Sequence, residues 1–269
     1  MSPLEAKKIS VQDNISTKGI ETNCGSKILE GYKPVFNAAI IDILESKGMI
    51  VADKHSSGEF GHETNVKIIG DSSYFFKPTY GTTPKFGIIA TTSSLDELGV
   101  YAQNIEDCAA FFGIKISEEN SLKIGKLEAL DMMPDHIKAT YEIIACAESS
   151  SNLARYDGLQ YGYRVETDIK TRSEGFGTDV KRRIMLGSLV LSSDYYESYY
   201  KKAMQVRELI KRECDKLFEQ YDAVISPCKQ VAALAGLPLI SISSNMYLIG
   251  AAFGEAKLLQ AAKQVGGVS

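Results

Sequence analysis

The chain has 269 residues, 44% hydrophobic and 24% charged, which is typical of a globular protein with a sizeable core. Its formal net charge of -4 argues against a broad nucleic-acid-binding surface, because such surfaces usually lie on basic domains. Five dispersed cysteines without a CxxC motif predict reduced thiols in a reducing compartment. At the start of the chain, residues 1–14 lack the apolar core of a secretory signal, and no later run of about 18 apolar residues predicts a membrane span.

The first third of the chain predicts one helix-to-strand unit after a loop. Residues 9–34 are rich in Asn, Gly, Thr and Ser, which predicts a short strand followed by loop. The apolar spacing of residues 37–47 predicts a helix that Gly48 ends. Residues 49–52 are apolar and predict a buried strand.

Residues 55–63 contain two histidines and a glutamate that a helix would place on one face. Such a face, formed by His55, Glu59 and His62, would suit a metal ion. Gly58 and Gly61 interrupt a helix, however, and no fourth ligand is evident. We therefore interpret the segment as a surface loop and predict no metal site.

The middle of the chain predicts short elements. Residues 86–90 suit a strand, and the capping-box pattern of residues 94–97 predicts a short helix. Residues 105–112 predict a further helix, with Asn104 as its N-cap and Gly113 at its end.

The last third begins with a long amphipathic helix over residues 197–221. Its apolar positions recur at spacings of three and four: Val206, Ile210, Cys214, Leu217 and Tyr221. A short strand at residues 223–225 ends before Pro227, so helix and strand form an α/β unit. Residues 239–242 predict another strand, and residues 254–265 a closing helix.

Several segments together resemble one family. The sequence RSEGFG at residues 172–177 is followed by KRRI at 181–184 and by a tyrosine-rich segment. With KPTYG at 77–81 and LAGLP at 234–238, this pattern resembles the amidase-signature family, and within it the A subunits of glutamyl-tRNA(Gln) amidotransferase. The resemblance implies an α/β fold, a mixed sheet flanked by helices on both faces, here trimmed by internal deletions. It implies a single domain over residues 1–269.

The family's catalytic relay of lysine, cis-serine and serine is not recognisable in this sequence. Gln12 stands where the resemblance places the lysine, and a carboxamide is not a base near neutral pH. The family's glycine- and serine-rich segment is missing before KPTYG, where the chain has only Gly70-Asp71-Ser72-Ser73. Ser72 and Ser73 are candidates for a replacement nucleophile, or are a turn. Cys228 is a further candidate nucleophile, or an inert buried thiol.

Two candidate substrate-binding residues follow from the resemblance. It places the family's glutamine-binding tyrosine at Tyr141 and its glutamine-binding arginine at Arg183. A guanidinium suits a substrate carboxylate because it donates two parallel hydrogen bonds. The alternatives are core packing for Tyr141 and a structural ion pair for Arg183.

The resemblance implies a protein of tRNA-dependent glutamine formation, in the cytoplasm or an organellar matrix. We interpret the chain as a catalytically silent relative that docks the partner B and C subunits as a scaffold or regulator. ATP and Mg²⁺ would then belong to a partner subunit, the chain itself would need no cofactor, and tRNA would contact it only indirectly. The alternatives are an active glutamine or amide hydrolase with a rebuilt serine or cysteine site, and a decaying gene product.

Overall fold

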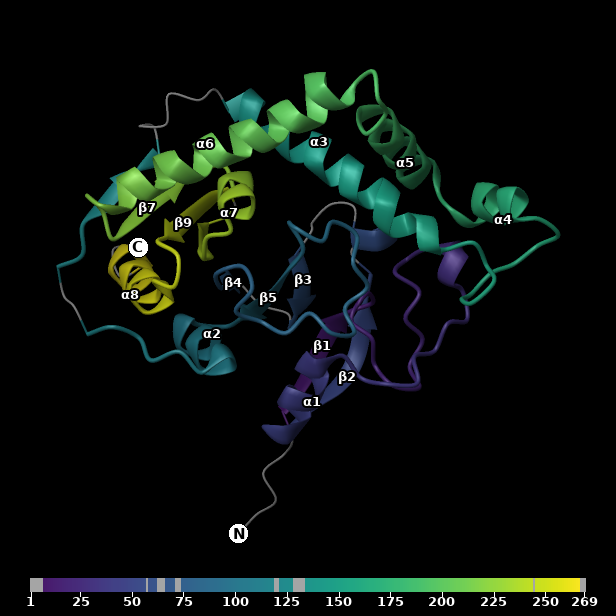
Figure 1. Ribbon diagram of the computed structural model, residues 1–269. Coiled ribbons are helices and arrows are strands. Elements are labelled where there is room, and N and C mark those ends of the chain that lie inside the picture. Colours follow the sequence, from purple (N-terminus) through teal and green to yellow (C-terminus); the bar gives the residue numbers. More distant parts are fainter. Residues whose placement is uncertain are drawn as a thin grey trace, which may run out of the picture. The chain divides into compact units, whose positions relative to one another are not determined.

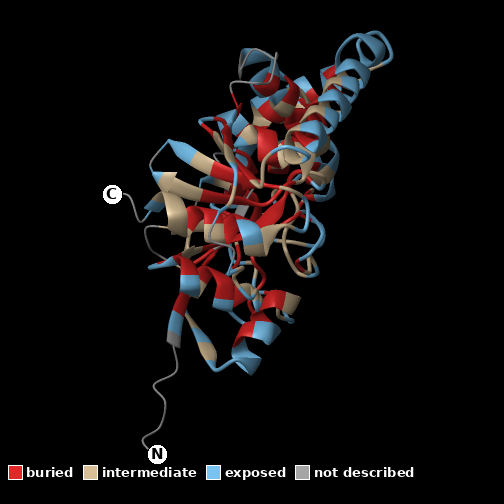
Figure 2. Ribbon diagram, turned by 90° about the vertical axis from the view of Figure 1, so that its left-hand side faces the viewer, coloured by how far each residue is buried: buried red, intermediate tan, exposed pale blue. Residues whose placement is uncertain are grey.

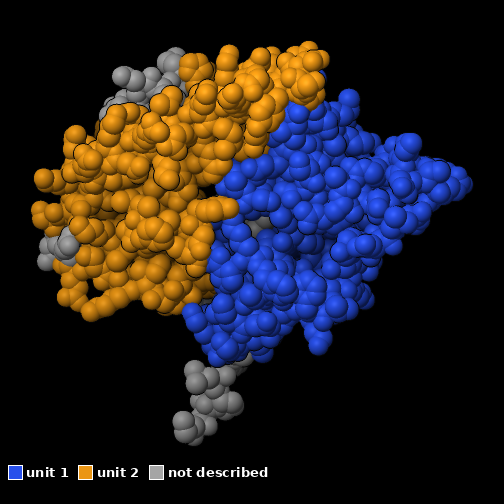
Figure 3. All heavy atoms as spheres, viewed as in Figure 1, with its two compact units in different colours: residues 1–71, 83–98, 145–191 blue, residues 72–82, 99–144, 192–269 orange. Residues whose placement is uncertain are grey.

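The protein is described from a computed structural model, which covers residues 7–56, 58–61, 66–70, 74–118, 121–127, 134–243 and 245–266 (Figure 1). The chain divides into two compact units, coloured separately in Figure 3. Unit 1 comprises residues 1–71, 83–98 and 145–191, and unit 2 comprises residues 72–82, 99–144 and 192–269. No helix within the described residues has the length and apolar character needed to cross a membrane.

Unit 1 contains a small mixed sheet built on β1 (Lys7–Gln12). β1 pairs in parallel with β2 (Met49–His55) and antiparallel with β3 (Val66–Ile69). The chain reaches β2 through α1 (Ala39–Ser46), so the predicted helix-to-strand unit is confirmed. The prediction of a buried strand here is wrong. β2 lies beside β1 at the edge of this sheet, and Ile50 is 53% exposed.

Short helices and loops of unit 1 enclose an apolar core. They include η1 (Lys27–Leu29), η2 (Glu59–Gly61) and η4 (Leu153–Arg155), with α4 (Asp168–Gly175) and α5 (Thr178–Val190). The core consists of Cys24, Ile28, Leu29, Phe60, Leu153, Tyr156, Phe176 and Val180. Phe60 is only 1% exposed, so the described residues 58–61 do not form the surface loop predicted from the sequence.

Unit 2 contains a larger mixed sheet. Its strand order is β5 (Glu97–Ala102), β4 (Tyr74–Lys77), β8 (Leu239–Ser243), β9 (Met246–Gly250), β7 (Ala223–Ser226) and β6 (Ile124–Lys126). Neighbouring strands are antiparallel, except that β6 and β7 are parallel. Buried residues are frequent along these strands (Figure 2). This confirms the predicted mixed sheet.

Helices flank the unit 2 sheet. The helix α8 (Glu255–Gly266) packs against β8 and β9, and α2 (Ile105–Phe112) packs against α8 and β4. The long helix α6 (Lys201–Phe218) packs against α7 (Gln230–Ala235). The predictions for α2, α6, α8, β7 and β8 are therefore confirmed, with ends that differ by a few residues.

Two predictions for the middle of the chain are wrong. Residues 86–90 form no strand, because only one isolated bridge joins Ile15 to Ile88. Residues 94–97 form no helix, and Glu97 instead begins β5. The Ser94 N–H donates to Glu148 from α3 (Pro134–Asn152), a contact distant in the sequence that outweighs the local capping pattern.

Candidate functional site

The position that the family resemblance gives to a catalytic lysine lies at the end of β1. Gln12 pairs with His55 of β2 and is fully buried. Its carboxamide can donate and accept hydrogen bonds, but it cannot take up a proton near neutral pH. The end of β1 therefore does not supply the base that an activated hydroxyl requires.

Two titratable side chains lie close to this strand end. Burial raises the pKa of Asp13, partly offset by Lys54 and His55. Burial lowers the pKa of Lys54 to about 8, against the opposing effect of Cys24 and Asp13. The Lys54 amine donates to the Ile15 carbonyl at 2.8 Å and to the Thr22 hydroxyl at 2.5 Å. Lys54 was not among the predicted site residues, because the strand predicted from the sequence ends at Ala52 whereas β2 continues to His55.

The remaining candidate nucleophiles gain no support from the described structure. Ser72 and Ser73 lie outside the described residues and stay predictions. Cys228 lies just after β7, and its thiol is 3.3 Å from Gln230 Oε1. A carboxamide oxygen accepts a hydrogen bond from the thiol but does not deprotonate it, so this contact does not produce the thiolate that a nucleophile needs.

The two predicted glutamine-binding residues lie on different helices. Tyr141 is half-buried on α3, and Arg183 is buried on α5 with 7% of its surface exposed. Residue 141 belongs to unit 2 and residue 183 to unit 1. Their role in binding glutamine stays a prediction.

The side chains considered for a metal ion have other partners. Ser10 Oγ lies 3.1 Å from His55 Nδ1. Glu59 accepts hydrogen bonds from the Ser26 hydroxyl at 2.5 Å and from the Gly177 N–H at 3.0 Å. His62 lies outside the described residues, and those that are described contain no group of three His, Cys, Asp or Glu suited to a metal.

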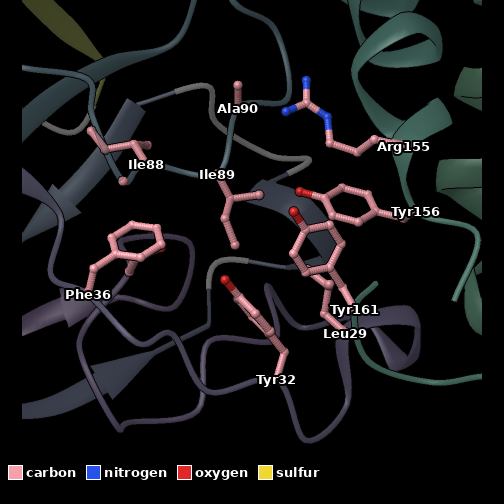
Figure 4. A pocket seen from close by; sticks show the side chains of 11 residues that line it. Leu29, Tyr32, Phe36, Ile88, Ile89, Ala90, Arg155, Tyr156 and Tyr161 are labelled. Carbon is pink, nitrogen blue, oxygen red and sulfur yellow. The ribbon is translucent and has the colours of Figure 1, made fainter. Parts of the chain in front are cut away.

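Unit 1 contains a pocket of about 210 Å³ that the sequence analysis did not predict (Figure 4). Its residues come from four separate segments of the chain: Ser16, Leu29, Tyr32, Phe36, Gly87, Ile88, Ile89, Ala90, Arg155, Tyr156 and Tyr161. Three tyrosines and one arginine form one side of it. Nothing in the sequence joins these segments, apart from the nearness of Arg155, Tyr156 and Tyr161 in one motif.

The turn that carries Arg155 and Tyr156 is bonded to α4. The Arg172 guanidinium donates to the carbonyls of Leu153 at 2.9 Å and Tyr156 at 2.8 Å. It also lies 5.0 Å from the centre of the Phe176 ring. Arg172, the first residue of the RSEGFG motif, therefore positions the polar side of the pocket.

A family model described as Amidase matches residues 2–68 and 127–248 of this chain. Among curated proteins, the A subunit of glutamyl-tRNA(Gln) amidotransferase from Lachnoclostridium phytofermentans is 31% identical over 409 aligned positions, covering 97% of this chain and 83% of that protein. The corresponding A subunit from Archaeoglobus fulgidus is 31% identical over 388 positions, covering 96% and 85%.

Solved structures of an amidotransferase A subunit and of an amidase also resemble this chain. The crystal structure of the glutamyl-tRNA(Gln) amidotransferase A subunit from Thermotoga maritima matches with a TM-score of 0.65 and 25% identity, covering 96% of this chain and 82% of that one. A crystal structure described as an amidase matches with a TM-score of 0.72 and 15% identity, which shows the fold alone. The predicted resemblance and fold are confirmed.

The alignments also show how much shorter this chain is. Because 97% of 269 residues is about 261, about 148 of the 409 aligned positions in the Lachnoclostridium phytofermentans protein have no counterpart here. The family model likewise leaves residues 69–126 unmatched. These residues include Ser72, Ser73 and the link between β3 and β4.

Proposed function

Because the chain belongs to the amidase family, we propose that it is an A-subunit-like protein of glutamyl-tRNA(Gln) amidotransferase that does not hydrolyse glutamine itself. The similarity to curated A subunits, at about 30% identity over nearly the whole chain, supports the first part. In this proposal the chain acts as a scaffold or regulator that assembles with B and C subunits.

The link between β3 and β4 is the observation that carries the second part. Only four residues, Gly70–Ser73, separate Ile69 at the end of β3 from Tyr74 at the start of β4. In the family, this is the place of the long glycine- and serine-rich segment with both serines and the oxyanion-binding turns. The family's catalytic lysine is also missing, because Gln12 stands in its place at the end of β1.

The chemistry of amide hydrolysis makes the combined loss severe. The reaction needs an activated nucleophile, a base and donors for the developing oxyanion. Removing one oxyanion donor alone raises the barrier by about 3 kcal/mol. With nucleophile, base and donors all missing, we expect no glutamine turnover above background.

The same proposal assigns the nucleotide chemistry to other chains. ATP and Mg²⁺ would bind to a partner subunit, and this chain would need no cofactor. tRNA would be bound by the partners, in keeping with the net charge of -4 on this chain.

Co-expression of the full chain with B and C subunits from the same source tests both parts. We expect one complex of the three proteins on size-exclusion chromatography, and no ammonia from glutamine with the chain alone or in the complex. A matched complex made with the full-length A subunit of Lachnoclostridium phytofermentans serves as the positive control for ammonia release. Failure to co-purify with either partner would overturn the assembly part of the proposal.

Substitutions at the three remaining nucleophile candidates test its catalytic part. If the chain does release ammonia, Ser72→Ala, Ser73→Ala and Cys228→Ala identify the source, with the exposed Ser188→Ala on α5 as control. Loss of ammonia release in one of the first three, with normal release in Ser188→Ala, would replace our proposal by an active hydrolase with a rebuilt site.

A further inference from the structure

The pocket of unit 1 has one polar and one apolar wall. The polar wall consists of Tyr32, Tyr156, Tyr161 and Arg155, and Figure 4 shows the three hydroxyl oxygens along the same side of the pocket. The apolar wall consists of Phe36, Ile88, Ile89 and Ala90. A ligand with a polar head and a compact apolar body would match both walls.

The tyrosine rings of the polar wall pack against one another and against the core. Tyr156 is only 6% exposed, and its ring packs 5.5 Å from the Phe60 ring and 6.0 Å from the Tyr161 ring. Tyr161 in turn makes an edge contact with Tyr32 at 5.5 Å. Because these rings support one another, their hydroxyls are in place before a ligand arrives, which lowers the entropic cost of binding.

The apolar wall is attached to the backbone after β1. Ile89 N–H donates to the Asn14 carbonyl at 2.9 Å, and Ser16 N–H donates to the Gly87 carbonyl at 2.9 Å. The bridge between Ile15 and Ile88 adds to this connection. These bonds and all the lining residues of the pocket lie within the described ranges.

The electrostatics favour a negatively charged head. Arg155 is the only charged residue among the described residues that line the pocket. Two of its nitrogens donate to Asn152, Nε to the carbonyl at 2.7 Å and Nη2 to the side-chain oxygen at 2.9 Å, which leaves other N–H donors of the guanidinium for a ligand. Burial raises the pKa of Tyr32 and of Tyr156, so both phenols remain protonated donors at neutral pH.

The hydroxyl of Tyr156 supports the same conclusion. The residue is buried and lines the pocket. A deeply buried hydroxyl that lines a pocket usually bonds to something, because leaving it unpaired is costly.

We propose that this pocket binds a small organic monocarboxylate, with the carboxylate at the polar wall and the apolar part against Ile88 and Ile89. At about 30 Å³ per water, 210 Å³ corresponds to about seven water molecules, so the ligand is small. The pocket lies below the ~300–1,000 Å³ of sites for larger ligands. This inference is independent of the proposed amidotransferase role.

Calorimetric titration of the full chain with phenylacetate tests the proposal, alongside its uncharged counterpart phenylacetamide and inorganic phosphate. Tyrosine emission gives a second readout, because the chain has no tryptophan. We expect saturable binding of phenylacetate at least tenfold tighter than that of the amide or of phosphate. Equal binding of the amide, equal binding of phosphate, or no binding at millimolar phenylacetate would overturn the proposal.

Variants locate the binding. Tyr156→Phe and Tyr32→Phe each remove one hydroxyl with little change of shape, and Arg155→Gln removes the charge. A hydrogen bond to a charged group is typically worth a factor of about ten to a hundred, so we expect losses of affinity in that range. Tyr199→Phe, at an exposed tyrosine of unit 2, is the matched control and should bind normally. Unchanged affinity in both Tyr→Phe pocket variants would place any binding elsewhere and overturn the proposal.

Discussion

At the scale of single residues, Lys54 makes the pH dependence of stability predictable. In the unfolded chain its amine keeps its proton up to a pKa of 10.5, whereas burial lowers the folded pKa to about 8. Between these values the unfolded chain binds more protons, so the free energy of unfolding rises with pH. The difference corresponds to at most about 3.4 kcal/mol. Because the amine is only partly buried, we expect a gain of about 1 to 2 kcal/mol.

Urea unfolding of the wild type and of Lys54→Met at several pH values between 7 and 10 measures this effect. The variant lacks the amine but retains all tyrosines, so the difference between the two curves isolates Lys54. The wild type should gain stability relative to Lys54→Met as pH rises through about 8. Parallel curves would show that the folded amine titrates normally.

Gln12 permits a second prediction at this scale. Replacing this fully buried carboxamide by lysine would place an ammonium group inside the sheet of unit 1. We expect Gln12→Lys to lower the free energy of unfolding by about 3 kcal/mol, because it would bury a charge in place of a neutral carboxamide. We also expect no gain of glutaminase activity, because the family's serine-bearing segment is still missing. Gln12→Met, which adds no charge, should cost less. Denaturant unfolding and an ammonia assay on the same samples check both statements.

At the scale of elements, the approach of α5 to α3 depends on a glycine. A Cβ at Gly187 would overlap the Cys146 carbonyl of α3 and crowd the Ser150 side chain. Gly187→Ala should therefore destabilise the protein by about 1 to 3 kcal/mol, although alanine is the better helix former by about 1 kcal/mol. Ser188→Ala, at the exposed neighbouring position, should be close to neutral. Thermal or denaturant unfolding compares the two, and equal stability would mean that the helices can separate slightly without cost.

The same scale shows which elements the sequence could predict. The helix α2 was predictable because residues next to it in the sequence determine where it begins and ends. Asn104 Oδ1 accepts a hydrogen bond from the Asp107 N–H at 2.7 Å, and Gly113 adopts a left-handed backbone conformation. Residues 86–90 have strand-like composition but no neighbouring strand beyond the single bridge at Ile88. Residues 94–97 include Asp96, whose carboxylate accepts from the N–H groups of Thr91 and Thr92, and the Ser94 N–H donates to Glu148 of α3. The missing strand partner of residues 86–90 and the bond from Ser94 to Glu148 depend on distant segments that no local pattern contains.

At the scale of the whole molecule, the two units share elements of the chain. α3 contributes residues to unit 2 up to Ile144 and to unit 1 from Ala145. β5 contributes its residues up to Leu98 to unit 1 and its remaining residues to unit 2. We therefore expect the units to unfold together. The five buried free cysteines can show whether the units unfold together, because they are divided between the units. Cys24 and Cys146 lie in unit 1, and Cys108, Cys214 and Cys228 lie in unit 2.

Thiol labelling with a colorimetric disulfide reagent at increasing urea measures how many cysteines react. We expect almost no reaction in the native protein and all five thiols in one transition. Burial raises the pKa of Cys108 and of Cys214 to about 12, which further slows the reaction before unfolding. A plateau at two or at three reacted thiols would show that one unit unfolds before the other.

The candidate site also illustrates what is visible only in the whole molecule. Motif resemblance predicted the family and drew attention to Arg172, because these residues are contiguous in the sequence. It did not predict the pocket, which joins Tyr32, Ile89 and Tyr156 from segments more than fifty residues apart. The pocket depends on ring packing and on the bonds from Arg172 to the turn, and neither leaves a periodic pattern.

The interleaving of the units has a consequence for genetics. Since each unit takes its residues from three stretches of the chain, neither can be excised by cutting the coding sequence once. A premature stop after Leu191 would leave every stretch of unit 1 but only two stretches of unit 2. Two co-expressed fragments divided between residues 83 and 144 would each hold both units incomplete, so they would have to associate before either unit could fold.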